Sequence, residues 1–381
     1  MDKYKIEIEK IIKNVNRRNG DYFYKLIRKI SLNKEKKFCV FGAGDLGLFL
    51  VRTLYEMDGD IKLDYFIDNS QEKRGKKIYK NAVCISSDEM KNLSKDTLVI
   101  IASQYHSEIK EQLEFMGFWN TIEVFCFNYI KFNLFYIDRL DEIKQKICNL
   151  FDILEDDKSK NVVLEIIRNY LEMDPLRMDF RKIMTKDQGY PMDILTLTEE
   201  EIFLDAGAFN GDTILEFLSK TEEKFKLIYG FELDKCNFQK MKNVLSGLAP
   251  EIRNKINIHN LGLWDREAKI SYDESSSPTS KINEIGNEIA KVNSIDNIFV
   301  DNPVTLIKMD IEGAEKRALY GAEKTIKRYK PKLAISIYHE IDDLWEIPML
   351  IKNYIPEYKI YIRHHKTGDD DTLCYAILNN S

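Results

Sequence analysis

The chain has 381 residues, of which 44% are hydrophobic and 31% are charged, a composition typical of a globular domain protein. Its formal net charge is −6, so no overall basic field favours a nucleic-acid partner. It contains no run of about 18 apolar residues, and its first residues lack the apolar core of a secretory signal. We therefore expect two or three domains, no membrane insertion and a cytoplasmic location.

Residues 4–30 have the apolar spacing of helices, and Gly20 divides this segment into two. A small α/β unit follows at residues 37–127, with Cys39, Cys84 and Cys126 in or beside its apolar runs. We interpret these cysteines as reduced core residues. No cysteine pair has CxxC spacing and no histidine is set at zinc-ligand spacing, so we predict no metal site.

A glycine loop opens the first helix of this α/β unit. The loop GAGDLG contains Gly42, Gly44 and Gly47, and Asp68 ends the next strand about 20 residues further on. This is the fingerprint of a dinucleotide-binding fold. The unit holds roughly four strands, too few for a complete dehydrogenase. The loop is therefore either a nucleotide or sugar-nucleotide site or part of a scaffold.

Residues 131–200 are predicted to form a helical connector. Two stretches of apolar spacing indicate helices, the second beginning at Asp156-Asp157 and ending before Asp174-Pro175. The turn-rich segment 187–191 follows just before the next strand. This segment could cover a bound ligand or serve as a surface linker.

Residues 201–234 are the most informative stretch of the chain. A short apolar strand ends in Asp205, a turn with Gly207 and Gly211 follows, and an amphipathic helix begins near Asp212 or Thr213. A second apolar strand then ends in an acid at residue 232. Strand, glycine loop, helix, strand and acid make up half of a nucleotide-binding doubly wound sheet.

Each polar position in this stretch has a chemical reason. Asp212 and Thr213 are suited to cap the helix, and Glu232 can accept both hydroxyls of a ribose. Asp205, just before the loop, would repel a pyrophosphate but suits a cationic group. S-adenosylmethionine carries both an amino-acid tail and a sulfonium. The pattern thus favours a methyltransferase over a dehydrogenase.

The downstream strands bring further acids to the same edge of the sheet. Strand 305–310 ends in Asp310 and strand 333–339 ends in His339, while segments 360–365 and 372–377 form a closing hairpin. We predict that Asp310 or His339 acts as the base. Leu263 and Trp264 are placed in the loop expected to contact the adenine. Segment 273–295 is polar, and its run 275–280 is typical of a mobile loop. The segment either helps to form the acceptor pocket or is a solvated insertion, and the charged residues from Glu315 to Arg328 are expected on a solvated helix face.

The chain from about residue 201 onward resembles the FkbM family of S-adenosylmethionine-dependent methyltransferases. The resemblance is carried by LDAGAFNGDT, GFELD, LGLWDREAKIS, YIRHH and above all the block from Lys308 to His339. It implies a class I methyltransferase fold and methyl transfer, usually to a hydroxyl. Phe209 and Ser336 depart from the family pattern, which affects the acceptor side.

Together these observations predict an α/β protein with a small Rossmann-like domain at 1–130, a helical connector at 131–200 and a Rossmann-like class I methyltransferase domain at 201–381. The expected acceptor is a hydroxyl of a sugar, glycan or natural-product precursor, including a nucleotide sugar, and a homo-oligomer is allowed for. One alternative is an NAD- or sugar-nucleotide-binding enzyme acting through the first glycine loop. The other is a binding module without activity.

Overall fold

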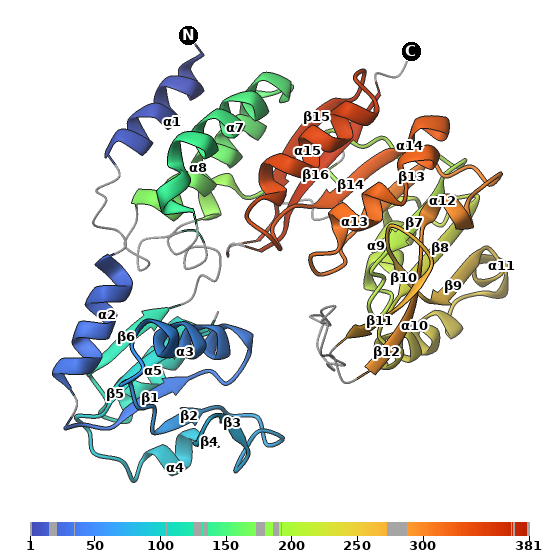
Figure 1. Cartoon of the computed structure of the whole chain (residues 1–381). Helices are drawn as coiled ribbons and strands as arrows, with labels where there is room; N and C mark the ends of the chain where they lie inside the picture. Colours follow the sequence, from blue (N-terminus) through green and yellow to red (C-terminus); the bar gives the residue numbers. More distant parts are fainter. Residues whose placement is uncertain are drawn as a thin grey trace. The chain divides into compact units, whose positions relative to one another are not determined.

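The computed structural model describes residues 2–14, 21–33, 35–103, 105–124, 132, 136–172, 180–185, 190–191, 193–272, 288–366, 368 and 370–378. The chain forms two compact units (Figure 1). The first unit contains residues 1–7, 141–166 and 180–381, and the second contains residues 8–140 and 167–179. Residues of the predicted connector therefore belong to both units.

The second unit is built on a six-stranded sheet of order β3-β4-β2-β1-β5-β6. Its strands are β1 (Phe38–Phe41), β2 (Tyr65–Ile67), β3 (Lys77–Tyr79), β4 (Ala82–Ile85), β5 (Leu98–Ala102) and β6 (Thr121–Val124). All neighbouring strands are parallel except β3 and β4. The sequence predicted roughly four strands, so the short pair β3–β4 is a correction.

The helices of this unit are α2 (Asp21–Leu32), α3 (Asp45–Met57), α4 (Ser87–Met90) and α5 (His106–Phe115), with a 3-10 turn at Ile137–Arg139. One hydrophobic cluster joins the sheet to α5 through residues such as Cys39, Val99 and Leu113. Cys39 and Cys84 are buried and unpaired, as predicted. Cys126 lies outside the described residues.

The first unit is built on a seven-stranded sheet of order β15-β16-β14-β13-β7-β8-β9. Its strands are β7 (Ile202–Ala206), β8 (Leu227–Glu232), β9 (Ile256–Asn260), β13 (Leu306–Met309), β14 (Lys332–Ser336), β15 (Lys359–His364) and β16 (Thr372–Ile377). In this sheet β16 runs antiparallel to both of its neighbours, β14 and β15, and all the other strand pairs are parallel. This order confirms the predicted doubly wound fold, and it reverses between β7 and β13, where such sheets bind ligands.

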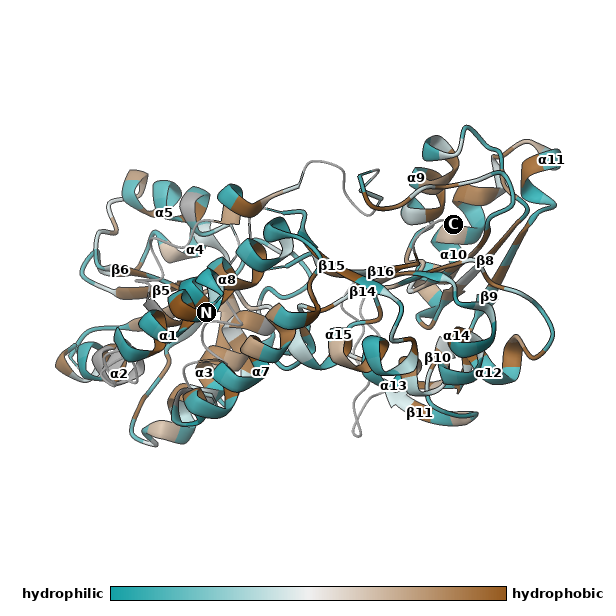
Figure 2. Cartoon of the chain, turned by 90° about the horizontal axis from the view of Figure 1, so that it is seen from above, coloured by the Kyte–Doolittle hydropathy of each residue, from teal (hydrophilic) through white to brown (hydrophobic). Residues whose placement is uncertain are grey.

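Helices cover both faces of this sheet. On one face α9 (Asp212–Lys220) and α10 (Lys235–Ser246) pack their apolar residues against Phe203, Ile228 and Leu306. The helices α13 (Glu315–Tyr320), α14 (Glu323–Tyr329) and α15 (Asp343–Tyr354) pack against one another, and α15 also contacts β16. Figure 2 shows that hydrophobic residues concentrate along the strands. Short helices α11 (Pro250–Arg253) and α12 (Ile295–Ile298) complete the unit.

A second, small sheet lies beside the large one. It has the order β10-β12-β11, with strands β10 (Gly262–Leu263), β11 (Ala268–Tyr272) and β12 (Glu288–Asn293). The strand that residues 288–293 form within the polar segment 273–295 was not predicted from the sequence. The serine-rich run at 275–280 lies outside the described residues.

The two connector helices belong largely to the first unit. Helix α7 (Leu140–Ile153) is followed by α8 (Asp157–Glu172), close to the predicted start of the second helix. The Arg363 guanidinium of β15 donates to Asp156 Oδ2 (2.6 Å) and to Ser159 Oγ (2.9 Å), which fixes the start of α8 on the sheet. A 3-10 turn at Phe180–Ile183 leads toward β7.

The first turns of helix α1 (Lys3–Asn14) pack on the same helices. The rings of Tyr4 and Phe151 lie 5.8 Å apart, and Lys3 Nζ lies 2.7 Å from Asp157 Oδ2. Among the helices that the structure describes, none has the length and apolar content needed to cross a membrane.

Candidate functional site

A cleft with a volume of about 470 Å³ opens at the carboxyl edge of the seven-stranded sheet. Its floor is formed by the ends of β7, β8 and β13 and its walls by the segments that follow them. The described residues that line it are Gly207, Phe209, Asp212, Thr213, Glu216, Phe231, Glu232, Leu233, Leu261, Gly262, Leu263, Lys308, Asp310, Ile311, Glu312, Ala314, Tyr338, Lys366, Asp371 and Leu373. Most of the residues predicted from the C-terminal motifs are therefore brought together.

The glycine loop after β7 is shaped by two left-handed glycines. Gly207 has φ +83°, and a Cβ there would lie 1.9 Å from the carbonyl oxygen of Asp310. Glycine is thus required for the end of β7 to approach the end of β13. Gly211, with φ +90°, precedes the first turn of α9, so Asp212 and Thr213 reach the cleft. Phe209 also adopts a left-handed φ of 44°.

Glu232 stands at the end of β8 and faces this loop. Its Oε2 accepts the N–H of Phe209 and its Oε1 accepts the N–H of Asp234, each at 2.8 Å. Burial raises the pKa of Glu232 to about 7, although both backbone N–H groups favour the charged form. The carboxylate therefore holds the loop in shape and also lines the cleft.

Asp205 is fully buried beneath the loop, and it does not itself line the cleft. Neither of its carboxylate oxygens has a hydrogen-bond partner among the described residues. Lys308 sits beside it in register on β13 and, because parallel partners share a face, its side chain lies on the same side of the sheet. Burial raises the pKa of Asp205 to about 7, and the charge of Lys308 opposes part of that rise.

This buried acid should make stability depend on pH. Because the folded-state pKa of Asp205 is raised, its contribution to stability is full in acid and is lost as the pH rises through about 7. We expect Asp205→Asn to be more stable than the wild type by roughly 2 kcal/mol at about pH 8 and to match it near about pH 4. Urea unfolding at the two pH values measures the difference.

The control for this prediction is Asp301→Asn, because the side chain of Asp301 is 82% exposed. It should change stability equally little at both pH values. A destabilised Asp205→Asn protein at about pH 8 would show that the acid is a net stabiliser of the fold.

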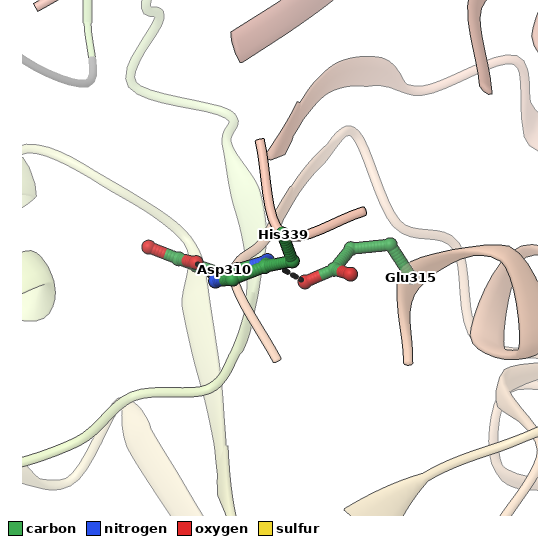
Figure 3. A group of neighbouring side chains, drawn as sticks. All are labelled: Asp310, Glu315 and His339. Carbon is green, nitrogen blue, oxygen red and sulfur yellow. Dashed lines mark ion pairs between the residues drawn. The ribbon is translucent and has the colours of Figure 1, made fainter. Parts of the chain in front are cut away.

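Asp310 and His339 form a cluster with Glu315 (Figure 3). His339 lies three residues beyond the end of β14, and its ring is placed between two carboxylates. Its Nδ1 is 3.0 Å from Glu315 Oε1, and its Nε2 is 3.5 Å from Asp310 Oδ1. Asp310 lines the cleft, whereas His339 is buried behind it.

The protonation of this cluster follows from its charges. Burial alone would lower the pKa of His339, but Glu315, Asp310 and Glu312 raise it to about 9. Burial alone would raise the pKa of Asp310, but His339 and Lys308 hold it below its ordinary value. Near neutral pH the pair is therefore an imidazolium beside a carboxylate. A protonated His339 cannot accept a proton, which argues against it as the base.

The same three side chains have ligand atoms within 4.8 Å of one another, a spacing at which a metal ion could be held. However, Glu315 and Asp310 face different nitrogens of the ring. An ion bound to one nitrogen would leave the other carboxylate on the far side. The arrangement fits a bridging imidazolium better than a metal site.

Leu263 and Trp264 end up in different surroundings. Leu263 lines the cleft, as expected for a residue near the adenine. The ring of Trp264 has the guanidinium of Arg317 5.7 Å from its centroid, and Trp264 is not among the described lining residues. The structure therefore does not bring Trp264 into the cleft.

Several lining residues were missed from the sequence. Lys308 could have been found, because it lies two residues before Asp310 and so on the same face of β13. Three other lining residues belong to no recognised sequence motif. Tyr338 follows β14, and Lys366 and Asp371 lie between β15 and β16. Glu315, predicted on a solvated face, is fully buried. That prediction was wrong, because the first turn of α13 packs its acid inward against His339.

The glycine loop of the second unit connects β1 to α3, as the sequence predicted. Gly42 has φ +110°, and a Cβ on Gly47 would lie 1.9 Å from the Gly42 carbonyl oxygen. Gly44 precedes α3 and has no atom within 4 Å of where a Cβ would be. Asp68 accepts the N–H groups of Ala43 (3.0 Å) and Ser70 (2.9 Å) and pairs with Lys73 at 3.1 Å. Asp68 thus holds its own loop, as Glu232 does.

Each of the two units contains a stretch that matches a known protein family. Residues 205–365 match the family described as the methyltransferase FkbM domain, and residues 34–121 match the family described as C2185-like, N-terminal. No curated protein matches the chain significantly.

Three solved structures are similar to this chain to different extents. The methyltransferase FkbM from Methylobacillus flagellatus aligns with a TM-score of 0.64 and 20% identity, covering 95% of this chain and 100% of that one. Fibrillarin from Aeropyrum pernix, solved with bound S-adenosyl-L-methionine, covers 48% of this chain and 70% of its own, at 14% identity and a TM-score of 0.30. A precorrin-6y C5,15-methyltransferase from Geobacter metallireducens covers 51% of this chain and 94% of its own, at 8% identity and a TM-score of 0.32.

The last two TM-scores are too low to carry an argument, but the first structure has the same fold over 95% of this chain. Most of the residues that line the crevice at the reversal of strand order lie within the matched range 205–365, and Lys366, Asp371 and Leu373 lie just beyond it. The C-terminal part of this chain is therefore an FkbM methyltransferase domain with a Rossmann-like class I fold, and the protein is a methyltransferase.

Proposed function

We propose that the first unit methylates a hydroxyl group of a sugar, a glycan or a natural-product precursor, using S-adenosylmethionine. The observation that carries the proposal is the division of the cleft between two parts of the sheet. The end of β8 and the segment after β9 contribute Glu232 and the apolar residues Phe231, Leu261 and Leu263, whereas β13, on the other side of β7, contributes Lys308 and is followed by Asp310. The first part suits a nucleoside and the second a hydroxylated acceptor.

The residues of the first part fit the cofactor. Glu232 would accept the ribose hydroxyls, Leu263 would contact the adenine, and the Gly207–Gly211 loop with Asp212 and Thr213 would enclose the amino-acid tail. The buried Asp205 carboxylate lacks a hydrogen-bond partner among the described residues, and a nearby ammonium group would offset its charge. When bound, S-adenosylmethionine supplies a methyl group that leaves its sulfonium sulfur for the acceptor oxygen.

The charge of the cleft bears on the acceptor. Its lining has six carboxylates and two lysines among the described residues: Asp212, Glu216, Glu232, Asp310, Glu312 and Asp371 against Lys308 and Lys366. This surplus of negative charge suits a cationic cofactor and repels a phosphorylated acceptor. A neutral hydroxylated molecule is therefore favoured over a nucleotide sugar in this cleft.

Asp310 is the proposed acceptor of the hydroxyl proton. It lines the cleft and is kept charged by His339 and Lys308. A carboxylate with a low pKa is a weak base toward a free alcohol. It suffices once the oxygen has begun to bond to the methyl carbon, because the hydroxyl proton then becomes strongly acidic.

Calorimetric titration with S-adenosylhomocysteine tests the proposal. We expect saturable binding to the wild type and roughly 10–100-fold weaker binding to Glu232→Ala, which loses charge-assisted hydrogen bonds to the ribose. The control is Glu216→Ala, because Glu216 is a carboxylate of the cleft that lies outside the first part. Its affinity should stay within about threefold of the wild type.

A folded wild-type protein that gives no heat and no thermal shift with S-adenosylhomocysteine would refute the cofactor assignment. Parallel titrations with UDP and NAD examine the loop from Gly42 to Gly47, for which a nucleotide remains a proposal. A cytoplasmic location and a homo-oligomer also remain predictions.

A further inference from the structure

We propose that Glu315 and His339 are positioning residues, which together hold the Asp310 carboxylate charged and correctly oriented at the cleft. The inference rests on the proposed function for its catalytic meaning, because Asp310 matters to the reaction only if it receives the acceptor's proton. The arrangement itself can be tested without any acceptor.

Of the three residues Glu315, His339 and Asp310, Glu315 lies farthest from the cleft. It is fully buried in the first turn of α13, and its Oε1 accepts the N–H of Ile311 at 2.8 Å. The same oxygen lies 3.0 Å from His339 Nδ1. Glu315 therefore fixes two things at once, the imidazole ring and the chain directly after Asp310.

His339 connects Glu315 to the acids at the cleft. Its Nε2 lies 3.5 Å from both Asp310 Oδ1 and Glu312 Oε2, and both of these acids line the cleft. Figure 3 shows Asp310 and Glu315 on opposite sides of the ring. Tyr338 O–H donates to Asp310 Oδ1 at 3.2 Å. With a proton on each nitrogen, the imidazolium faces a carboxylate on both sides. The nearer carboxylate, Glu315, orients the ring, and the farther one, Asp310, meets the ligand.

The charged groups around the cluster show why Glu315 is the decisive partner. Lys308 faces Asp310 from β13, and Asp343, a buried acid of α15, faces Glu315. Lys316 pairs with Asp343 at 3.3 Å and with Glu346 at 2.9 Å and so compensates those two acids. Glu315 is the acid that lies nearest the ring among the described residues.

The variant Glu315→Gln isolates the effect of the Glu315 charge on the protonation of His339. Its amide oxygen can still accept the Ile311 N–H, so the turn is retained, whereas the charge beside Nδ1 is lost. The matched control is Glu346→Gln. It makes the same change of charge at an acid that pairs with Lys316 and does not face the His339 ring. Because one pKa unit is a tenfold change in proton affinity, loss of the nearest carboxylate should lower the affinity of His339 for its proton at least about tenfold.

The measurement is an NMR pH titration of the full protein with 15N-labelled histidine. The chain has five histidines, and His339→Gln assigns the signal of His339 by its disappearance. In the wild type this ring should stay protonated up to about pH 9. In Glu315→Gln its midpoint should fall by at least about one pH unit, and in Glu346→Gln it should not move.

Two results would overturn the inference. One is a wild-type His339 that titrates near the ordinary pKa of a free histidine, which needs no variant and so holds even if Glu315→Gln does not fold. The other is an equal midpoint in Glu315→Gln and the wild type. Neither depends on S-adenosylhomocysteine binding, so failure of this inference is distinguishable from failure of the proposed function.

Discussion

Gly207→Ala should be the most damaging glycine-to-alanine change among the described residues that line the cleft. The new Cβ would lie 1.9 Å from the Asp310 carbonyl oxygen, at a residue with φ +83°. Backbone strain and overlap together should cost roughly 2–5 kcal/mol of unfolding free energy. Moving β7 away from β13 would also distort the loop, so any protein that folds should bind S-adenosylhomocysteine roughly 100-fold more weakly.

Urea unfolding and calorimetry measure the two effects. The control is Gly247→Ala at the end of α10, where the nearest atom to a new Cβ is 3.5 Å away. Its stability should stay within about 1 kcal/mol of the wild type. A Gly207→Ala protein of normal stability and affinity would mean that the strands can separate without harm to the cleft.

Arg363→Leu should be strongly destabilising although Arg363 lies outside the cleft. The guanidinium is buried and donates to Asp156 Oδ2 and Ser159 Oγ, so leucine would remove the cation that pairs with Asp156 and one of the hydrogen bonds of Ser159. Asp156 is partly exposed, which reduces the penalty below that of a fully buried pair. We expect a loss of roughly 2–4 kcal/mol in the first unit.

Tryptophan fluorescence can follow that unit alone. The chain has three tryptophans, and Trp119 is the one in the second unit, so a Trp119→Phe background leaves Trp264 and Trp345 as reporters. The control, Arg317→Leu, removes a 57% exposed arginine paired with Asp265 and should cost no more than about 1 kcal/mol. Equal losses in the two variants would show that the Arg363 contacts contribute no more than a surface pair.

The elements predicted from sequence were those that local patterns specify. Apolar strands followed by glycine turns or acids located β1, β7, β8 and β13 within one or two residues. The hairpin β15–β16 had strong apolar alternation. The pair β3–β4 and the sheet of β10, β11 and β12 were missed, because these strands are two to six residues long and depend on pairing partners that local sequence does not reveal.

In the candidate site, too, some residues could be predicted from local sequence and others could not. Glu232 and Asp310 were found because the carboxyl ends of parallel strands share one edge. The displacement of His339 behind Asp310 could not be predicted, since it depends on the path of the chain after β14 ends at Ser336. The burial of Glu315 depends on a histidine that lies beyond two helices and a strand. Charge alone therefore made it indistinguishable from the exposed acids around it.

The packing of Tyr4 on Phe151 and of Lys3 on Asp157 means that residues 8–140, the larger part of the second unit, are an insertion in the sequence of the first. The first unit closes a long loop around that insertion. The entropy of loop closure grows only with the logarithm of loop length, at about 0.6 kcal/mol for each doubling. An inserted unit of quite different size could therefore occupy the same place during evolution, with little change in the stability of the methyltransferase around it.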